Sequence, residues 1–273
     1  MCYYNGQRVD KAEYIRLKNL EKAVSNYGFL DRQIQFGFQY SQCAVLVPVF
    51  NESEDFEIVQ MEWGFLPSYV PNREEAAKFR TGYKNAEGKW IQGYTTLNAK
   101  AENLFVNEKG RKSIFADAAR SRRCLVLSTG FFEWRHLPKL GKKGQTLKAT
   151  EKYPYYISVK DQEYFFMAGI YEPWIDRETN ERVNTVAILT TEANSLMAQI
   201  HNTKLRMPTI LDNDLAHEWL FSDLNEERIT EIAKTHIHSR DMEACSISKE
   251  FLKELEPTKP FSYEEVPALE LNV

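Results

Sequence analysis

The sequence predicts an α+β protein with a mainly antiparallel sheet or β-barrel-like core and peripheral helices, in one compact domain. Runs rich in β-branched and aromatic residues follow one another along the chain and do not alternate strictly with helical patterns. The chain has 273 residues, which allows one large domain or two ordinary ones. Neither an internal repeat nor a clear linker divides it.

The first element is predicted to be a helix. Between Asp10 and Gly28, apolar residues recur at three- and four-residue spacing. Asp10 with Glu13 resembles a capping box, and Gly28 suits the C-terminal end of a helix. The pattern Asn98-Ala99-Lys100-Ala101-Glu102 would, if helical, place the Asn98 amide and the Glu102 carboxylate on one face.

Further along the chain, six runs are typical of strands and four of short helices. The strand-like runs are Ala44–Phe50, Phe56–Met61, Cys124–Leu127, Tyr155–Val159, Tyr164–Ile170 and Val183–Thr190. The helical patterns are Ile114–Arg120, Asn194–His201, Asp214–Phe221 and Glu226–Lys234. Two polar stretches, Pro71–Thr95 and Pro138–Thr150, are predicted loops, the second of them mobile. Residues 249–273 hold three bases and six acids and predict a loosely packed acidic tail.

The composition is that of a globular protein. Lys and Arg number 35 against 39 Asp and Glu, so the net charge is −4, and 43% of the residues are hydrophobic. No apolar run approaches the roughly 18 residues of a membrane span, and no secretion signal is seen at the N-terminus. The four cysteines lie far apart and form no CxxC pair, which argues against a disulfide framework or a zinc ribbon and fits the cytoplasm.

The charge is distributed unevenly along the chain. From Asn98 to Lys152 there are thirteen bases and five acids, a net charge of +8, so the rest of the chain carries −12. Such a segment predicts either a local surface for a polyanion or a solvated lysine-rich loop. Charge alone favours the loop.

Cys2, Asn98, Glu133 and His201 are the candidate catalytic residues, each in a different segment. Removal of Met1 would make Cys2 a 1,2-aminothiol, which condenses with an aldehyde to an imine and closes to a thiazolidine, or acts as a nucleophile whose own amine is the base. Glu133 lies between large aromatic residues, where desolvation raises the pKa of a carboxyl group. His201 stands before Arg206 and could serve as an acid or base. Each has a plain alternative: a small buried residue at Cys2, a helix cap at Asn98, a buried ion pair at Glu133 and a structural histidine at His201.

Taken together and in this order, the motifs resemble those of the SOS response-associated peptidase (SRAP) family. They are Met1-Cys2, the Trp63-Gly-x-x-Pro67 turn, Asn98-Ala-Lys-Ala-Glu102, Arg123-Cys-Leu, Gly130-Phe-Phe-Glu-Trp134, and His201 with Arg206-Met-Pro208. The resemblance implies that residues 1–248 form the catalytic and DNA-binding domain and that residues 249–273 form a tail. It also implies a sensor of abasic sites in single-stranded DNA that forms a covalent crosslink, with lyase and autoproteolytic activities and no metal or cofactor.

The resemblance also implies roles for individual residues. Cys2 would form the thiazolidine, Asn98 would position it, Glu133 would relay a proton from the amine, and His201 would act as an acid on the deoxyribose. The DNA-contacting set would be Trp63, Pro67, Lys100, Glu102, Arg123, Trp134, Arg206 and Met207, with the aromatic members stacking on bases. The implied partner is single-stranded DNA with abasic sites, with no membrane and no obligate protein partner.

The sequence departs from the family pattern at three places, and two rival functions stay open. Tyr3-Tyr4 stand where Gly-Arg is usual, Lys100 replaces an arginine, and four residues separate His201 from Arg206 where one is usual. These changes predict weaker DNA binding than in a typical member. The first rival is a cysteine hydrolase with an N-terminal nucleophile, which would ignore DNA. The second is a single-stranded DNA-binding module without chemistry, which would not need Cys2.

Overall fold

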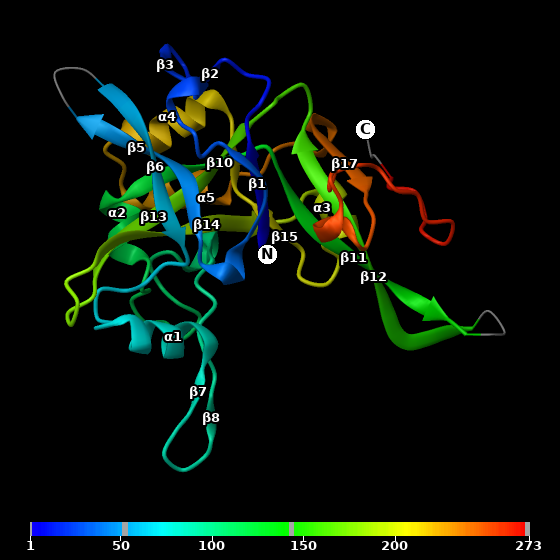
Figure 1. Cartoon of the computed structure of the whole chain (residues 1–273), viewed down its shortest axis with the longest axis horizontal. Helices are drawn as coiled ribbons and strands as arrows, with labels where there is room; N and C mark the ends of the chain where they lie inside the picture. Colours follow the sequence, from blue (N-terminus) through cyan, green and yellow to red (C-terminus); the bar gives the residue numbers. More distant parts are fainter. Residues whose placement is uncertain (1, 51–53, 142–144, 271–273) are drawn as a thin grey trace.

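Five strands close into a ring at the centre of the computed structural model, which describes residues 2–50, 54–141 and 145–270 (Figure 1). Around the ring lie β14 (Arg182–Glu192), β6 (Glu54–Trp63), β5 (Gln42–Phe50), β10 (Arg123–Ser128) and β13 (Phe165–Ile175), and β13 pairs back with β14. The β6–β14 pairing is parallel and the other four are antiparallel. The predicted α+β class with a mainly antiparallel, barrel-like core is therefore confirmed.

A second sheet of five strands carries the N-terminal residues. Its order is β17 (Met242–Ser246), β12 (Thr146–Val159), β11 (Gly130–Leu140), β1 (Tyr4–Arg8) and β4 (Asp31–Phe36), all antiparallel. Asn5 of β1 lies opposite Phe131 of β11. Cys2 and Tyr3 precede β1, and both pack in the cluster that contains Phe131.

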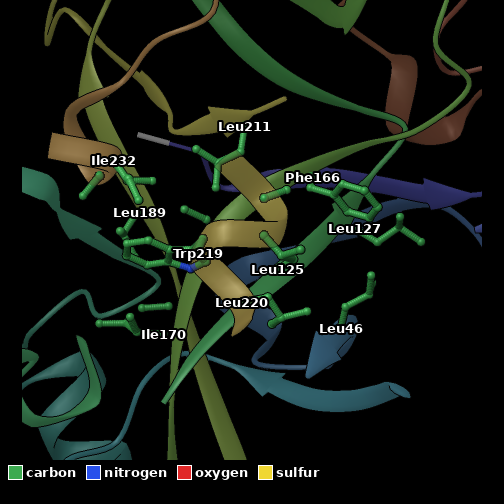
Figure 2. Packing of buried hydrophobic residues seen from close by; sticks show 14 of the residues in the cluster. Leu46, Leu125, Leu127, Phe166, Ile170, Leu189, Leu211, Trp219, Leu220 and Ile232 are labelled. Atoms are coloured by element: carbon green, nitrogen blue, oxygen red, sulfur yellow. The ribbon is translucent and has the colours of Figure 1, made fainter. Parts of the chain in front are cut away.

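Alternation along the ring strands divides the core into two clusters. Leu125 and Leu127 of β10 pack with the helices α4 (Asn213–Phe221) and α5 (Glu226–Lys234). Figure 2 shows Trp219 and Leu220 of α4 among the side chains of this cluster. Cys124 and Val126 belong to the other cluster, which joins the ring to the second sheet and to α3 (Ser195–Ile200). Both clusters follow from the two-residue period of strands.

The remaining elements are short. They are β2 (Tyr14–Leu17), β3 (Leu20–Ala23), α1 (Arg73–Thr81), β7 (Tyr83–Lys84), β8 (Trp90–Ile91), β9 (Asn98–Lys100), α2 (Ala116–Ser121), β15 (Arg206–Pro208) and β16 (Ile210–Leu211), with 3-10 turns at Val24–Asn26, Gly37–Gln39 (η2), Ala101–Asn103, Ser239–Asp241 and Phe251–Lys253. The β7–β8 hairpin projects from the body (Figure 1). No helix among the described residues has the length and apolar character needed to cross a membrane.

The predicted helix between Asp10 and Gly28 is wrong. The segment forms the β2–β3 hairpin, which turns at Lys18 with a left-handed φ of 52°. Ile15 and Leu17 are buried at a spacing of two, because they point to the same face of a strand. Apolar residues of two short strands and their turn happened to fall at helical spacing.

Four other expectations are corrected. The stretch Pro71–Thr95 contains α1, which Asn72 caps, and the β7–β8 hairpin. Most of Pro138–Thr150 belongs to β11 and β12, which stay paired to Leu140 and Thr146, while residues 142–144 lie outside the described part. The C-terminal segment packs on the body, since Phe251 is buried and Tyr263 Oη donates to the Ile247 carbonyl at 2.7 Å. Asn98 and Glu102 do not share a helix, because β9 precedes a 3-10 turn there.

Candidate active site

Cys2 is fully buried between the ring of strands and the second sheet. It packs in the cluster that includes Trp63 from the ring, Phe131 and Tyr155 from the second sheet, and Met197 from α3. Its Sγ lies 3.6 Å from the Tyr4 carbonyl oxygen. Burial raises the pKa of the thiol far above its usual range, and the nearby Glu133 carboxylate raises it further. The thiol is therefore neutral at physiological pH.

Asn98 holds the backbone of Cys2 in place. Strand β9 runs parallel to β14, with Asn98 opposite Ile188, which brings Asn98 to the N-terminal segment. Its Nδ2 donates to the Cys2 carbonyl oxygen at 2.9 Å. Its buried Oδ1 has no hydrogen-bond partner among residues 2–50, 54–141 and 145–270. A buried acceptor of this kind is costly unless a ligand or water pairs with it.

Glu133 is a buried carboxyl group on β11. Burial raises its pKa to about 7, against the opposing effects of the N-terminal amine and of the Trp134 backbone N–H. Its Oε2 lies 3.7 Å from Nε2 of His201, and it is close enough to Cys2 for its charge to act on the thiol. A carboxyl group with a pKa near neutrality can both accept and donate a proton at physiological pH.

His201 follows the last residue of α3, whose N-terminus is capped by the Asn194 side chain. Its Nδ1 lies 2.8 Å from the Arg206 carbonyl oxygen, which can only accept, so Nδ1 carries a proton. In the neutral ring, Nε2 is then the acceptor, on the side of Glu133. Burial lowers the pKa of His201 to about 4, so the ring is neutral at pH 7.

A loop clamp keeps His201 over β11 despite the longer spacing to Arg206. Asn202 Oδ1 accepts from the His136 backbone N–H at 3.1 Å, and its Nδ2 donates to the His136 carbonyl at 2.8 Å. The Leu205 N–H returns to the His201 carbonyl at 2.9 Å, and Leu205 takes a left-handed φ of 52°. The extra residues therefore bulge outward, and His201 stays in contact with Arg206.

The sequence profile of the SOS response associated peptidase (SRAP) family matches residues 8–253. The chain belongs to the SRAP family. The matched range begins after Cys2, so the place of Cys2 in the site is known from the contacts above.

Relatives and solved structures agree with this membership. "Abasic site processing protein YoqW" of Bacillus subtilis (strain 168) is 28% identical over 204 residues, 74% of this chain and 75% of that protein. "Abasic site processing protein HMCES" of Xenopus tropicalis is 26% identical over 187 residues, 62% of this chain and 46% of that protein. A crystal structure of a protein from Bacteroides thetaiotaomicron is similar with a TM-score of 0.69 and 32% identity, covering 95% of this chain and 97% of that chain.

The structure brings the four predicted SRAP catalytic residues together but separates the predicted DNA-contacting residues. Trp63, Pro67 and Met207 are buried, and Trp63 Nε1 donates to the Leu97 carbonyl at 2.9 Å. Arg123 is also buried, and its guanidinium donates to four backbone carbonyls, including that of Trp219 at 2.8 Å. As placed, these four side chains are buried and offer little surface to DNA.

Arg206 and Glu102 bind each other. The guanidinium donates to both carboxylate oxygens, at 2.7 and 3.0 Å, and also to the Thr190 carbonyl. The pair fixes the segment whose carbonyl orients His201. Lys100 is partly exposed and forms an ion pair with Glu108 at 2.6 Å.

Trp134 lies on the other face of the second sheet from Glu133. Phe131 belongs to the cluster around Cys2, whereas Phe132 and Trp134 belong to a separate cluster with Phe251. Successive residues of a strand point to opposite faces, so Glu133 shares the face of Phe131. Trp134 therefore packs in a different cluster from the thiol although it is next to Glu133 in sequence.

Five of the thirteen bases in the segment 98–152 form ion pairs among the described residues. Its ion-paired members are Lys100, Lys112, Arg120, Arg122 and Lys139. Exposed ion pairs of this kind are worth little in stability, but they weaken the long-range field of the segment. No cluster of three or more His, Cys, Asp or Glu that could hold a metal occurs within the described ranges.

Two contributors to the site were not expected from sequence. Asn202 has no pattern that marks it, because its clamp joins residues 66 apart. Tyr3 follows Cys2 directly and stood out only as a departure from the family pattern. Burial raises the pKa of the Tyr3 phenol, and the charges of Glu133 and Cys2 raise it further, so the phenol borders the same site.

Proposed function

We propose that this protein recognises an abasic site in single-stranded DNA and joins itself to it through Cys2 after Met1 has been removed. The observation that carries the proposal is the meeting of Cys2, Asn98, Glu133 and His201, from four segments far apart in sequence, with the 2.9 Å contact to Cys2 and the 3.7 Å approach of Glu133 to His201. Membership of the SRAP family and the names of relatives such as YoqW support abasic-site processing.

The covalent chemistry needs no outside oxidant or cofactor. The Cys2 α-amine attacks C1′ of the ring-opened sugar aldehyde to give a carbinolamine, which loses one water to give an imine. The thiol sulfur then adds to the imine carbon and its proton passes to the nitrogen, which closes a five-membered thiazolidine. One C–N bond and one C–S bond form, and one water leaves.

Glu133 is the proton carrier of this sequence. As a carboxylate it takes a proton from the Cys2 ammonium and frees the attacking amine. As a carboxylic acid it returns that proton to the carbinolamine hydroxyl, which leaves as water. A pKa of about 7 supports both steps at physiological pH.

His201 works with Glu133 during ring opening of the sugar. With its pKa lowered to about 4, the ring accepts at Nε2 at pH 7. The acid role on the deoxyribose therefore draws its proton from Glu133 across the 3.7 Å gap, through a bound hydroxyl or water. Asn98 positions Cys2 through its carbonyl and offers its buried Oδ1 to the substrate.

The state of the thiol favours this route over a cysteine hydrolase. A hydrolase of that kind attacks first with a thiolate. Burial and the Glu133 charge keep the Cys2 thiol protonated. In the proposed route the amine attacks first, and a neutral thiol adds afterwards to an activated imine.

A denaturing gel tests the proposal. Met-processed protein, checked by intact mass, is mixed with a single-stranded oligonucleotide that carries one abasic site, beside an intact oligonucleotide and a Cys2→Ala variant. The expected result is a heat-stable shifted band that requires both the abasic site and Cys2. No band from protein that lacks Met1 would overturn the proposal.

A further inference from the structure

An exposed aromatic pair lies beside the candidate nucleophile. The rings of Tyr3 and Phe38 are 4.8 Å apart at an angle of 49°. Phe38 is 41% exposed, and Tyr3 is half-buried. None of the chemistry above uses either ring.

The turn that carries Phe38 is firmly built. Phe38 is the middle residue of η2, whose Gly37 N–H donates to the Tyr3 carbonyl at 2.8 Å. A Cβ at Gly37 would lie 2.9 Å from a Leu97 methyl and 3.3 Å from the Trp63 ring, so glycine permits this close approach. Trp63 and Leu97 thus support the turn from below, and Phe38 is held at its surface.

The pair borders the reacting groups. Tyr3 is covalently next to Cys2 and packs against the cluster that contains Cys2. Leu97, which packs under the turn, is covalently next to Asn98. The Phe38 ring is therefore in contact with the residue that follows Cys2.

Resting on the function proposed above, we infer that Tyr3 and Phe38 form a stacking platform for the base next to the abasic nucleotide. An abasic sugar has no base of its own, so the flanking nucleotides must supply the apolar contact area. Aromatic side chains stack on bases with little regard to sequence. Phe38 is a positioning residue here, because it touches the neighbour and not the reacting sugar.

Binding to an intact single-stranded oligonucleotide tests the platform without the covalent step. We expect Phe38→Ala to weaken binding by about 10-fold in fluorescence anisotropy. Phe38→Tyr should bind like the wild type, whereas Phe38→Leu, which keeps apolar bulk, should not. Phe261→Ala is the matched control, since Phe261 is 49% exposed on the C-terminal segment. Equal binding by Phe38→Ala and wild type, or no binding by the wild type, would overturn the inference.

Crosslinking then tests which base is held. Three substrates carry one abasic site each. The first has a normal base on both sides, and in the other two tetrahydrofuran, a sugar without a base, replaces the 5′ or the 3′ neighbour. The wild type should reach half-maximal crosslinking at about 10-fold lower concentration with a flanking base on one side, and Phe38→Ala should lose that preference. A preference that survives Phe38→Ala contradicts the inference. Absence of crosslinking together with weakened binding by Phe38→Ala would instead refute the proposed function and leave the platform standing.

Discussion

Glu133 and His201 are buried together with opposite changes in pKa. Burial holds the pKa of Glu133 at about 7 and that of His201 at about 4. Between these values both groups are neutral, so the carboxyl group carries a proton and the ring nitrogen Nε2 is in its basic form. This is the state that general acid–base catalysis near pH 7 requires.

A first prediction follows from linkage. The pKa of Glu133 rises from 4.5 in the unfolded chain to about 7 in the fold, so its contribution to stability is present below pH 4.5 and lost as the pH rises to 7. Relative to wild type, Glu133→Gln should therefore gain on the order of 3 kcal/mol between pH 4.5 and pH 8 in urea unfolding. Glu87→Gln, at an exposed site, is the control. An unchanged difference across this pH range would refute the buried neutral carboxyl.

A second prediction separates amine from thiol. Cys2→Ser keeps the α-amine, if Met1 is removed, but loses the sulfur that closes the ring. We expect an imine that borohydride traps, no heat-stable crosslink without borohydride, and more strand cleavage, because an open imine promotes β-elimination at the sugar. Trapping and gel analysis measure all three. Loss of the borohydride-trapped adduct together with the crosslink would argue against attack by the amine.

At the scale of elements, the helices that the sequence predicts well carry their own signals. Helix α5 spans the predicted residues Glu226–Lys234, and α4 differs from its prediction by one residue. Both begin at side chains that cap the first turn, Asn225 and Asp212. The β2–β3 hairpin was missed because short strands leave no comparable local mark.

In the candidate site, too, some features have a local sequence signal and others depend on long-range contacts. Cys2, Glu133 and His201 stand out by residue type and neighbours, and the family resemblance joined them. The faces they occupy depend on strand register and long-range contacts, such as that of Asn98 with Cys2 across 96 positions. These contacts cannot be read from local sequence. Trp134 was predicted to contact DNA, and in the structure it lies on the opposite face of the sheet from Glu133.

A third prediction concerns the loop clamp. Asn202→Ala removes both bonds to the His136 backbone, which releases His201 from β11. We expect the free energy of unfolding to change by about 1 kcal/mol, because Asn202 is exposed, while the crosslinking rate falls by ~10-fold or more. Thr203→Ala, at the next exposed position, should behave like the wild type. A normal rate in Asn202→Ala would show that the clamp does not position His201.

At the scale of the whole molecule, the C-terminal segment (residues 249–270) packs against the second sheet. Tyr263 and Val266 pack against the cluster that contains Cys2, and Arg135 donates to the Pro267 carbonyl at 2.5 Å. Gln199 of α3 donates to the Glu270 carbonyl at 2.8 Å, so the segment also braces the helix that precedes His201. The acidic composition of this segment predicted loose packing, although Tyr263 and Val266 are apolar residues that pack against the core.

A fourth prediction tests that packing. Tyr263→Ala loses a ring contact with Tyr153 and the hydrogen bond to Ile247. We expect a loss on the order of 2 kcal/mol in unfolding free energy. Tyr83→Ala, on the projecting β7–β8 hairpin, should lose much less. Equal stability of the two variants would show that the segment contributes nothing to the fold.

A fifth prediction concerns charge. Because five of the thirteen bases of the segment 98–152 are already paired, DNA binding should involve few phosphates. The slope of log K against log salt for a single strand is about −0.7 per phosphate contact, so we expect a slope shallower than about −3. A much steeper slope, measured by anisotropy from low to high salt, would show that those ion pairs open on binding.

The intact mass of the denatured reaction product tests whether Cys2 closes a thiazolidine with the abasic site. Met-processed protein and an oligonucleotide with one abasic site should give an adduct whose mass is the sum of the two less one water, and borohydride should leave that mass unchanged. Such a product is the closed thiazolidine on Cys2. An adduct that gains two hydrogens with borohydride, or no adduct at all, would contradict the account.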